Sequence, residues 1–157
     1  MRNHQLVSVL AAGAVALLAS ADGIAAFTEY AGAQCVRVSG GIYNYQGGTV
    51  YNSSSLSTLN VICPLTRETS GLDGAQIYVY DRHPTQSVSC NVVSENYSEA
   101  GISATFNSMA STGTGFKLLE NFTNLTFSTV YATCSIPPSS GGAVSHVATL
   151  ITYPLTP

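Results

Sequence analysis

Apolar and polar residues alternate in short stretches along most of the chain. In LNVICPL at 59–65 every second residue is apolar, and in AQIYVYD at 75–81 aliphatic residues alternate with aromatic ones. Successive residues of a β-strand point to opposite faces of a sheet, so this period of two predicts strands with one buried and one solvated face. After the first 26 residues, no stretch has the pattern of a helix of about ten residues.

Turn-forming residues separate these stretches, and about eight or nine strands are expected. Many short strands at regular spacing are typical of an antiparallel sandwich or barrel, and the alternation favours sheets with one solvated face. The predicted fold class is therefore all-β, an antiparallel β-sandwich of the immunoglobulin-like or jelly-roll-like kind. The expected strands fall within residues 34–38, 40–48, 49–55, 58–64, 75–82, 86–94, 101–108, 116–120, 124–136 and 143–153.

The N-terminus has the features of an export signal. Arg2 provides a positive charge, residues 6–18 form an apolar run, and small residues suited to a signal peptidase end at Ala21. A membrane-spanning helix needs about 20 apolar residues, and Asp22 ends the run before that length. We therefore expect cleavage after Ala21, or alternatively after Ala26, and no membrane anchor in the processed protein.

Removal of residues 1–21 leaves enough chain for one domain with a core of its own. We expect a lead-in at 22–33, followed by a single β-sandwich domain at 34–157. The expected location of the processed protein is secreted or periplasmic.

The cysteines are Cys35, Cys63, Cys90 and Cys134. An even number of cysteines in an exported chain predicts two disulfides. The last three each fall on the apolar face of an expected strand, which suggests buried cross-links within or between sheets. Three pairings are possible. We favour Cys35–Cys63 with Cys90–Cys134, because elements close in sequence tend to be close in space.

Charged residues make up only 8% of the chain, against about 25% in an average soluble protein. The net charge is −3, and the five basic residues do not cluster. Binding of a phosphate backbone needs clustered Lys and Arg, so neither a nucleic acid nor an anionic membrane surface is expected as a partner. The many Ser, Thr and Tyr residues suit a sheet protein whose outer faces are polar but uncharged.

Asp81, Arg82 and His83 follow one another at the end of an expected strand. Asp81 could orient His83 as a general base, yet no Gly-x-Ser-x-Gly motif identifies a nucleophile. Pro84 ends the strand, and a solvated strand end is the preferred interpretation. No catalytic residue is therefore assigned.

The other imidazole of the expected domain is that of His146. It shares its parity with Ala148 and Leu150, which favours a partly buried ring bonded to a hydroxyl or a carbonyl. A metal site shared with His83 would need a third ligand, and no cysteine pair has the spacing of a zinc site. The sequence therefore predicts neither a metal nor a cofactor.

Tyrosines provide the clearest binding signal. Tyr78 and Tyr80 share one face of an expected strand, and Tyr43, Tyr45 and Tyr51 crowd an earlier region. Exposed rings with little charge nearby suit contact with a glycan or a protein surface. Packing of the rings across neighbouring strands is the competing structural interpretation, and it is the preferred one.

Four short motifs carry a resemblance. They are Cys-Pro-Leu at 63–65, IYVYD at 77–81, VSCNV at 88–92 and CSIPP at 134–138. Together they resemble a group of uncharacterised exported bacterial proteins with four cysteines and no assigned activity. The resemblance implies a disulfide-linked β-sandwich and nothing about catalysis.

The expected function is that of a secreted, non-catalytic β-sandwich protein with a binding or structural role outside the cytoplasm. Few ionisable side chains, the missing nucleophile motif and the missing metal spacing motivate this expectation. The alternative is a secreted hydrolase that uses His83 or His146 with Asp81.

Overall fold

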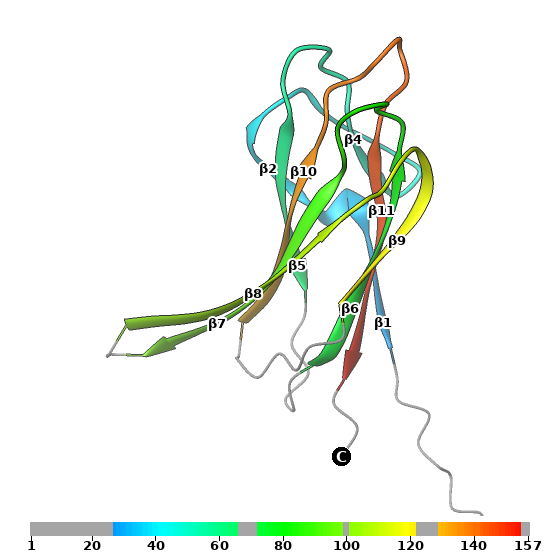
Figure 1. The fold of residues 1–157 in the computed structure, drawn as a ribbon. Helices are drawn as coiled ribbons and strands as arrows, with labels where there is room; N and C mark the ends of the chain where they lie inside the picture. The colour runs from blue at the N-terminus through cyan, green and yellow to red at the C-terminus, as the bar shows by residue number, and fades with distance from the viewer. Residues whose placement is uncertain (1–26, 66–71, 99–100, 122–128, 155–157) are drawn as a thin grey trace, which may run out of the picture.

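The computed structural model describes residues 27–65, 72–98, 101–121 and 129–154 (Figure 1). The expected signal peptide at 1–21 lies outside these residues. The described elements are β1 Thr28–Ala31, the 3₁₀ turn η1 Gly32–Gln34, β2 Val36–Gly40, β3 Tyr43–Gln46, β4 Thr49–Asn52, β5 Leu59–Leu65, β6 Leu72–Asp81, β7 Ser89–Ser98, β8 Gly101–Ala110, β9 Gly115–Asn121, β10 Thr129–Ile136 and β11 His146–Pro154. None of the described segments forms a helix long and apolar enough to cross a bilayer.

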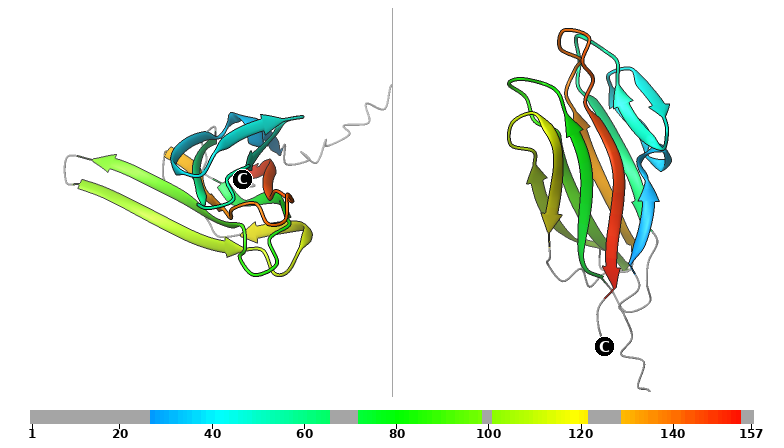
Figure 2. Two further views of the ribbon diagram at one scale, coloured as in Figure 1. Left: turned by 90° about the horizontal axis from the view of Figure 1, so that it is seen from above. Right: turned by 90° about the vertical axis from the view of Figure 1, so that its right-hand side faces the viewer.

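The strands form two antiparallel sheets, which lie against each other as the layers of a sandwich (Figure 2). One sheet has six strands in the order β3-β4-β11-β6-β9, and β1 also pairs with β11. The other has five strands in the order β2-β5-β10-β7-β8. The predicted antiparallel β-sandwich is therefore confirmed, with eleven strands instead of eight or nine.

Strand β1 lies in the segment that we expected to be a lead-in. Its four residues pair with β11, from Thr28 opposite Thr152 to Ala31 opposite Thr149. The Tyr30 side chain is buried and joins the hydrophobic core. The expected start of the sandwich at residue 34 is thus too late, because a four-residue strand has too short an alternation to be recognised before its pairing partner is known.

Two glycines join the stretches expected at 40–48 and 49–55. Gln46 pairs with Thr49, and Gly47 and Gly48 between them have φ values of 57° and 83°. Two consecutive residues with positive φ suit the primed turns of tight hairpins, which match the twist of the flanking strands. Gly47 and Gly48 therefore form the turn that pairs β3 with β4 in a hairpin.

The hydrophobic core lies between the two sheets. On β5 and β10 every second residue is buried, as the alternation predicts. The core is mainly aliphatic, and the largest fully buried side chains are Leu59, Ile77, Ile136, Leu150, Val50, Val61, Val79, Val88, Val92 and Val93.

Both disulfides belong to the five-stranded sheet. Cys35, just before β2, is bonded to Cys63 of β5, and Cys90 of β7 is bonded to Cys134 of β10. The second pair joins residues that lie directly opposite each other on neighbouring strands. All four cysteines are buried, and the favoured pairing is confirmed.

Asn52 connects the two sheets at one end of the sandwich. Its side chain is fully buried on β4, and its amide nitrogen lies 3.1 Å from the carbonyl oxygens of both Ile136 and Pro137 at the end of β10. The amide oxygen accepts hydrogen bonds from the N–H groups of Ile42 and Ser54. Although Asn52 begins an Asn-Ser-Ser sequon, its amide is occupied inside the folded domain.

Candidate binding site on the outer face of the six-stranded sheet

A row of rings crosses the outer face of the six-stranded sheet. Phe116 of β9 lies opposite Tyr80 of β6, Tyr80 lies opposite His146 of β11, and His146 lies opposite Tyr51 of β4. Residues directly opposite in an antiparallel pair project from the same face. We call these four residues, together with Tyr78, the aromatic row.

Neighbouring rings of the row contact one another. The centroids of Tyr80 and His146 are 5.4 Å apart in an edge-to-face arrangement, and those of Tyr51 and His146 are 6.3 Å apart. Tyr78 stacks on Phe116 with a centroid distance of 5.4 Å and an interplanar angle of 29°. Such distances and angles are typical of favourable ring pairs. Tyr51, His146 and Tyr80 thus form one set of contacting rings, and Tyr78 and Phe116 form a second set next to it.

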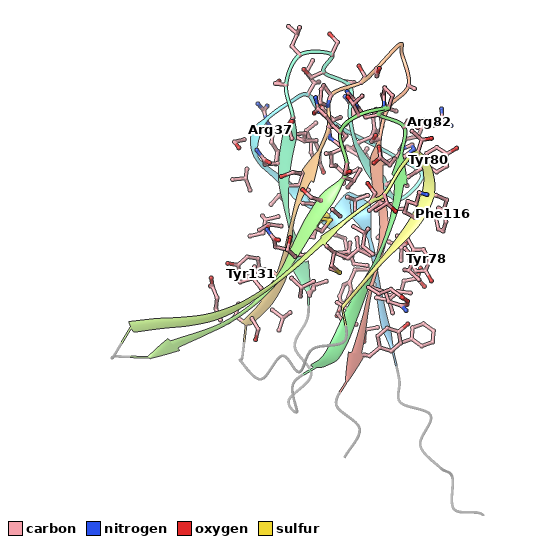
Figure 3. The ribbon with its side chains drawn as sticks, viewed as in Figure 1. Arg37, Tyr78, Tyr80, Arg82, Phe116 and Tyr131 are labelled. Atoms are coloured by element: carbon pink, nitrogen blue, oxygen red, sulfur yellow. A yellow bond between two sulfur atoms is a disulfide. The ribbon has the colours of Figure 1, made fainter. Side chains whose placement is uncertain are left out.

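The exposed part of the row lies at the β9 end. Phe116 is 60% exposed, whereas Tyr51, Tyr78, Tyr80 and His146 are half-buried. In Figure 3, Tyr78, Tyr80 and Phe116 lie on the same side of the molecule, away from Tyr131 of the other sheet. The half-buried rings therefore pack against neighbouring strands, and Phe116, which stacks on one of them, presents an exposed ring face.

Shallow depressions flank the row. One of about 340 Å³ lies at the Tyr51 end, and another of about 340 Å³ lies at the Phe116 end. A third, of about 530 Å³, adjoins them between β1 and the β3–β4 hairpin. Hydroxyl and amide side chains accompany the rings here, and the residues that line the depressions include Gln46, Thr49, Thr149, Glu29 and Ala148.

A β-bulge sets the direction of His146. The register of β11 against β6 shifts between Val147 and Thr149, so Ala148 is an extra residue on β11. Val147 and Leu150 are both fully buried although they are three positions apart. The expectation that His146 shares a face with Leu150 is therefore wrong, because the bulge resets the alternation and leaves His146 on the outer face.

Burial lowers the pKa of His146 below its ordinary value of 6.5, and the nearby Arg82 guanidinium lowers it further. Both causes disfavour the charged imidazole, since burial removes water and Arg82 carries a like charge. The ring of His146 therefore favours its neutral form, which suits a place between two tyrosines.

Tyr43 and Tyr45 lie elsewhere. Tyr43 packs against the hydrophobic core, and its hydroxyl donates a hydrogen bond of 2.8 Å to the carbonyl oxygen of Cys35. Tyr45 is 70% exposed and lies opposite Val50, whose side chain points into the core. Of the tyrosines that the sequence marked, the fold thus brings Tyr51, Tyr78 and Tyr80 together and leaves these two outside the row.

Asp81 is a buried connector and not a solvated strand end. Its carboxylate accepts hydrogen bonds from the hydroxyls of Ser111 and Ser145 and from the N–H groups of His83 and Val88. These partners come from the connections β6–β7, β8–β9 and β10–β11. The expectation of a solvated Asp81 is wrong, because the sequence does not show that three loops converge on it.

The two imidazoles have different surroundings. His83 Nδ1 accepts hydrogen bonds from the N–H groups of Thr85 and Gln86, so this nitrogen stabilises the loop between β6 and β7. His146 contacts rings. Within the described parts of the chain, neither imidazole is hydrogen-bonded to a carboxylate. Across the same residues, no group of three or more His, Cys, Asp or Glu is placed to hold a metal ion.

Phe116 and His146 are the row members that sequence reasoning missed. In FKLLE at 116–120 the alternation does place Phe116 opposite in parity to the buried Leu119. That signal marks Phe116 as an outer residue, but only the pairing of β9 with β6 places it next to Tyr80.

Several solved structures resemble this fold. A family two carbohydrate esterase from Cellvibrio japonicus has a TM-score of 0.50 at 8% identity, with 83% of this chain and 34% of that chain covered. A low-affinity xylan-binding module, CBM86, from Roseburia intestinalis has a TM-score of 0.44 at 11% identity, with 83% and 96% covered. A cellulohexaose complex of a family 29 carbohydrate-binding module mutant has a TM-score of 0.34 at 12% identity, with 80% of this chain and 90% of that chain covered. No protein-family model and no curated protein sequence matches the chain. At these identities the likeness is one of fold.

Proposed function

We propose that the protein is a non-catalytic glycan-binding domain that acts outside the cytoplasm, and that it binds saccharides on the aromatic row. The observation that carries this proposal is the alignment of four rings across four paired strands, ending in the exposed ring of Phe116.

The chemistry of a saccharide suits such a surface. The C–H groups on one face of a pyranose ring pack on an aromatic ring, while the hydroxyls at its rim need hydrogen-bond partners. Phe116 and Tyr78 supply apolar ring surface. Thr149 and Gln46 line the flanking depressions and supply uncharged polar groups. Ring surface bordered by neutral polar groups is typical of small-ligand sites with specific orientation.

A protein partner fits the row less well. A stable protein interface buries about 800 Å² on each partner, with a large apolar centre. Here the open apolar centre consists mainly of Phe116, with the smaller contribution of Leu118 beside it. The narrow row therefore favours an extended ligand such as an oligosaccharide.

Two observations support a location outside the cytoplasm. The chain begins with the features of an export signal, and both disulfides are buried in the domain. Disulfides form and persist in oxidising compartments. We also propose that the chain belongs to the exported four-cysteine group that its motifs resemble.

A binding assay with row and control variants tests the proposal. We expect wild-type protein to bind one or more immobilised polysaccharides, and Phe116→Ala to weaken that binding about tenfold, or ~1.4 kcal/mol. Replacing both Tyr78 and Tyr80 with Ala should abolish it. Tyr131→Ala removes a ring from the outer face of the other sheet and serves as the matched control.

Thermal unfolding of each variant separates binding from packing. The exposed Phe116 contributes little to the core, so its replacement should leave the melting temperature nearly unchanged. Unchanged binding by the Tyr78/Tyr80 variant, or loss of its fold, would show that these rings serve packing alone. Binding of no polysaccharide by the wild-type protein would refute the proposal.

A further inference from the structure

Arg82 comes directly after β6, and its guanidinium lies beside the Tyr80 ring of the aromatic row. Its backbone N–H donates a hydrogen bond of 2.9 Å to Ser145 Oγ, which holds the chain in place just after β6. The central carbon of its guanidinium lies 4.7 Å from the centroid of the Tyr80 ring. Figure 3 shows Arg82 above Tyr80 on the same side of the molecule as Phe116.

The Arg82 guanidinium has no carboxylate partner among the described residues. The neighbouring Asp81 carboxylate is buried and already accepts hydrogen bonds from other groups. Glu120 is hydrogen-bonded to a glutamine side chain, and Glu95 lies on the other sheet. Arg82 is thus an exposed cation held over an aromatic ring, with its charge uncompensated in this part of the molecule.

A guanidinium in contact with a ring face keeps its edge free. It carries five N–H donors in a planar fork, and two of them can bond to both oxygens of one carboxylate. Such charge-assisted pairs are stronger than neutral hydrogen bonds. Contact with Tyr80 restricts the orientation of the fork before a ligand arrives, which lowers the entropy that binding would cost.

We propose that Arg82 and the Phe116 end of the row form a subsite for a uronic acid residue of an acidic glycan. The sugar ring stacks on Phe116, and its carboxylate pairs with the guanidinium of Arg82. This inference rests on the proposed function and adds the class of saccharide to it.

Two charged side chains of opposite sign, Glu29 and Arg82, favour one orientation of an acidic sugar on this face. Glu29 lines the depression beside Tyr78 and Phe116, together with Thr149. A carboxylate near Glu29 would be repelled, whereas one near Arg82 would be attracted. The acidic group of the sugar therefore faces the end of β6, where Arg82 lies beside Tyr80.

Binding of polygalacturonate, alginate and glucuronoxylan, each compared with its carboxyl-reduced form, tests the assignment. Reduction converts the uronic acids to neutral sugars and keeps the backbone. We expect wild-type protein to bind at least one acidic polysaccharide about tenfold more tightly than its reduced form. Raising the salt concentration should narrow the difference, because an exposed ion pair is screened.

Variants of two arginines complete the test. Arg82→Gln should remove the preference, so that the acidic and the reduced forms bind about equally, and Arg82→Lys should keep part of the preference. Arg37→Gln, at an exposed arginine on β2 of the other sheet, should change neither. Both substitutions remove one exposed positive charge, so a general charge effect would appear in both.

Three outcomes would overturn the inference. They are equal binding of the acidic and reduced forms by the wild-type protein, a preference that survives in Arg82→Gln, and equally tight, Arg82-dependent binding of a sulfated galactan. Binding of the neutral forms in any of these cases would leave the proposed function intact. Failure of every polysaccharide to bind would refute both.

Discussion

The two sheets of the sandwich share one core and have different outer faces. On the five-stranded sheet, Ser135 Oγ donates to Asn60 Oδ1, and Asn60 Nδ2 donates to Ser39 Oγ. We call these three residues, which link β10, β5 and β2, the polar ladder. On the six-stranded sheet the corresponding cross-strand line is the aromatic row. The residues of the polar ladder are hydrogen-bonded to one another. The aromatic row, by contrast, exposes the ring of Phe116 and has the exposed guanidinium of Arg82 beside it.

This difference shows how one strand pattern serves two purposes. Both sheets bury alternate aliphatic residues on the inner face, so stability does not depend on which residues face outwards. Cross-strand pairs of either kind stabilise a sheet. Both disulfides lie in the sheet with the polar ladder, whereas the opposite sheet carries the candidate site. Cross-linking and the candidate binding surface are thus separated in space.

Removal of a disulfide should have the largest effect. Cys90 and Cys134 enclose a separation of 44 residues, for which the loop-entropy model gives about 4 kcal/mol. We expect the paired substitution of both residues by Ala to lower the free energy of unfolding by about that amount in urea titration. Because the bridge lies in the other sheet, polysaccharide binding by the folded variant should persist.

The equivalent substitution of Cys35 and Cys63, with a separation of 28 residues, is a matched comparison. It should cost about 3.5 kcal/mol by the same model. Loss of less than about 1 kcal/mol from both pairs would contradict the view that the five-stranded sheet depends on its cross-links.

Asp81 should be next in effect. Asp81→Ala leaves the hydroxyls of Ser111 and Ser145 and the His83 N–H without the carboxylate that accepts from them, and the Val88 N–H keeps only its bond to Ser111 Oγ. We expect a loss of about 3 kcal/mol in the free energy of unfolding, because unsatisfied buried donors are costly. Urea titration measures this loss, and hydrogen exchange should show faster exchange of the His83 N–H, which donates to Asp81.

Glu120→Ala is the control for Asp81. Glu120 is an exposed carboxylate with one hydrogen bond to Gln76, so its removal should cost less than about 0.5 kcal/mol. If the two substitutions cost the same, the three loops do not depend on Asp81.

The smallest effect concerns pH. Because the pKa of His146 is lowered in the folded protein, the unfolded chain takes up a proton first as the pH falls. The contribution of neutral His146 to stability is therefore fully present above pH 6.5 and declines as the pH falls from 6.5 toward the lowered pKa. Nuclear magnetic resonance titration of the imidazole measures that pKa directly.

Arg82→Gln should raise the pKa of His146, since it removes the like charge, and Arg37→Gln should leave it unchanged. An unaltered pKa in Arg82→Gln would mean that the guanidinium does not lie close enough to the row to act on it. That result would also weaken the proposed anionic subsite.

The sequence by itself determined the fold class and the cross-links. Alternation has a period of two only in strands, so the residues that form the core could be read from their parity, as for Leu59, Val61 and Cys63. Local order also favoured the correct disulfide pairing. The parity of Tyr78 and Tyr80 against the buried Ile77 likewise placed both tyrosines outside the core.

Only the tertiary structure decided which outer residues meet. Phe116 and Tyr80 are far apart in sequence and become neighbours through the register of β9 on β6, which depends on contacts along both strands. The bulge at Ala148 reverses the parity that the sequence assigned to His146, and three loops enclose Asp81. Local alternation determines the face that a side chain takes, whereas pairing between distant strands determines its neighbours, and the candidate site consists of those neighbours.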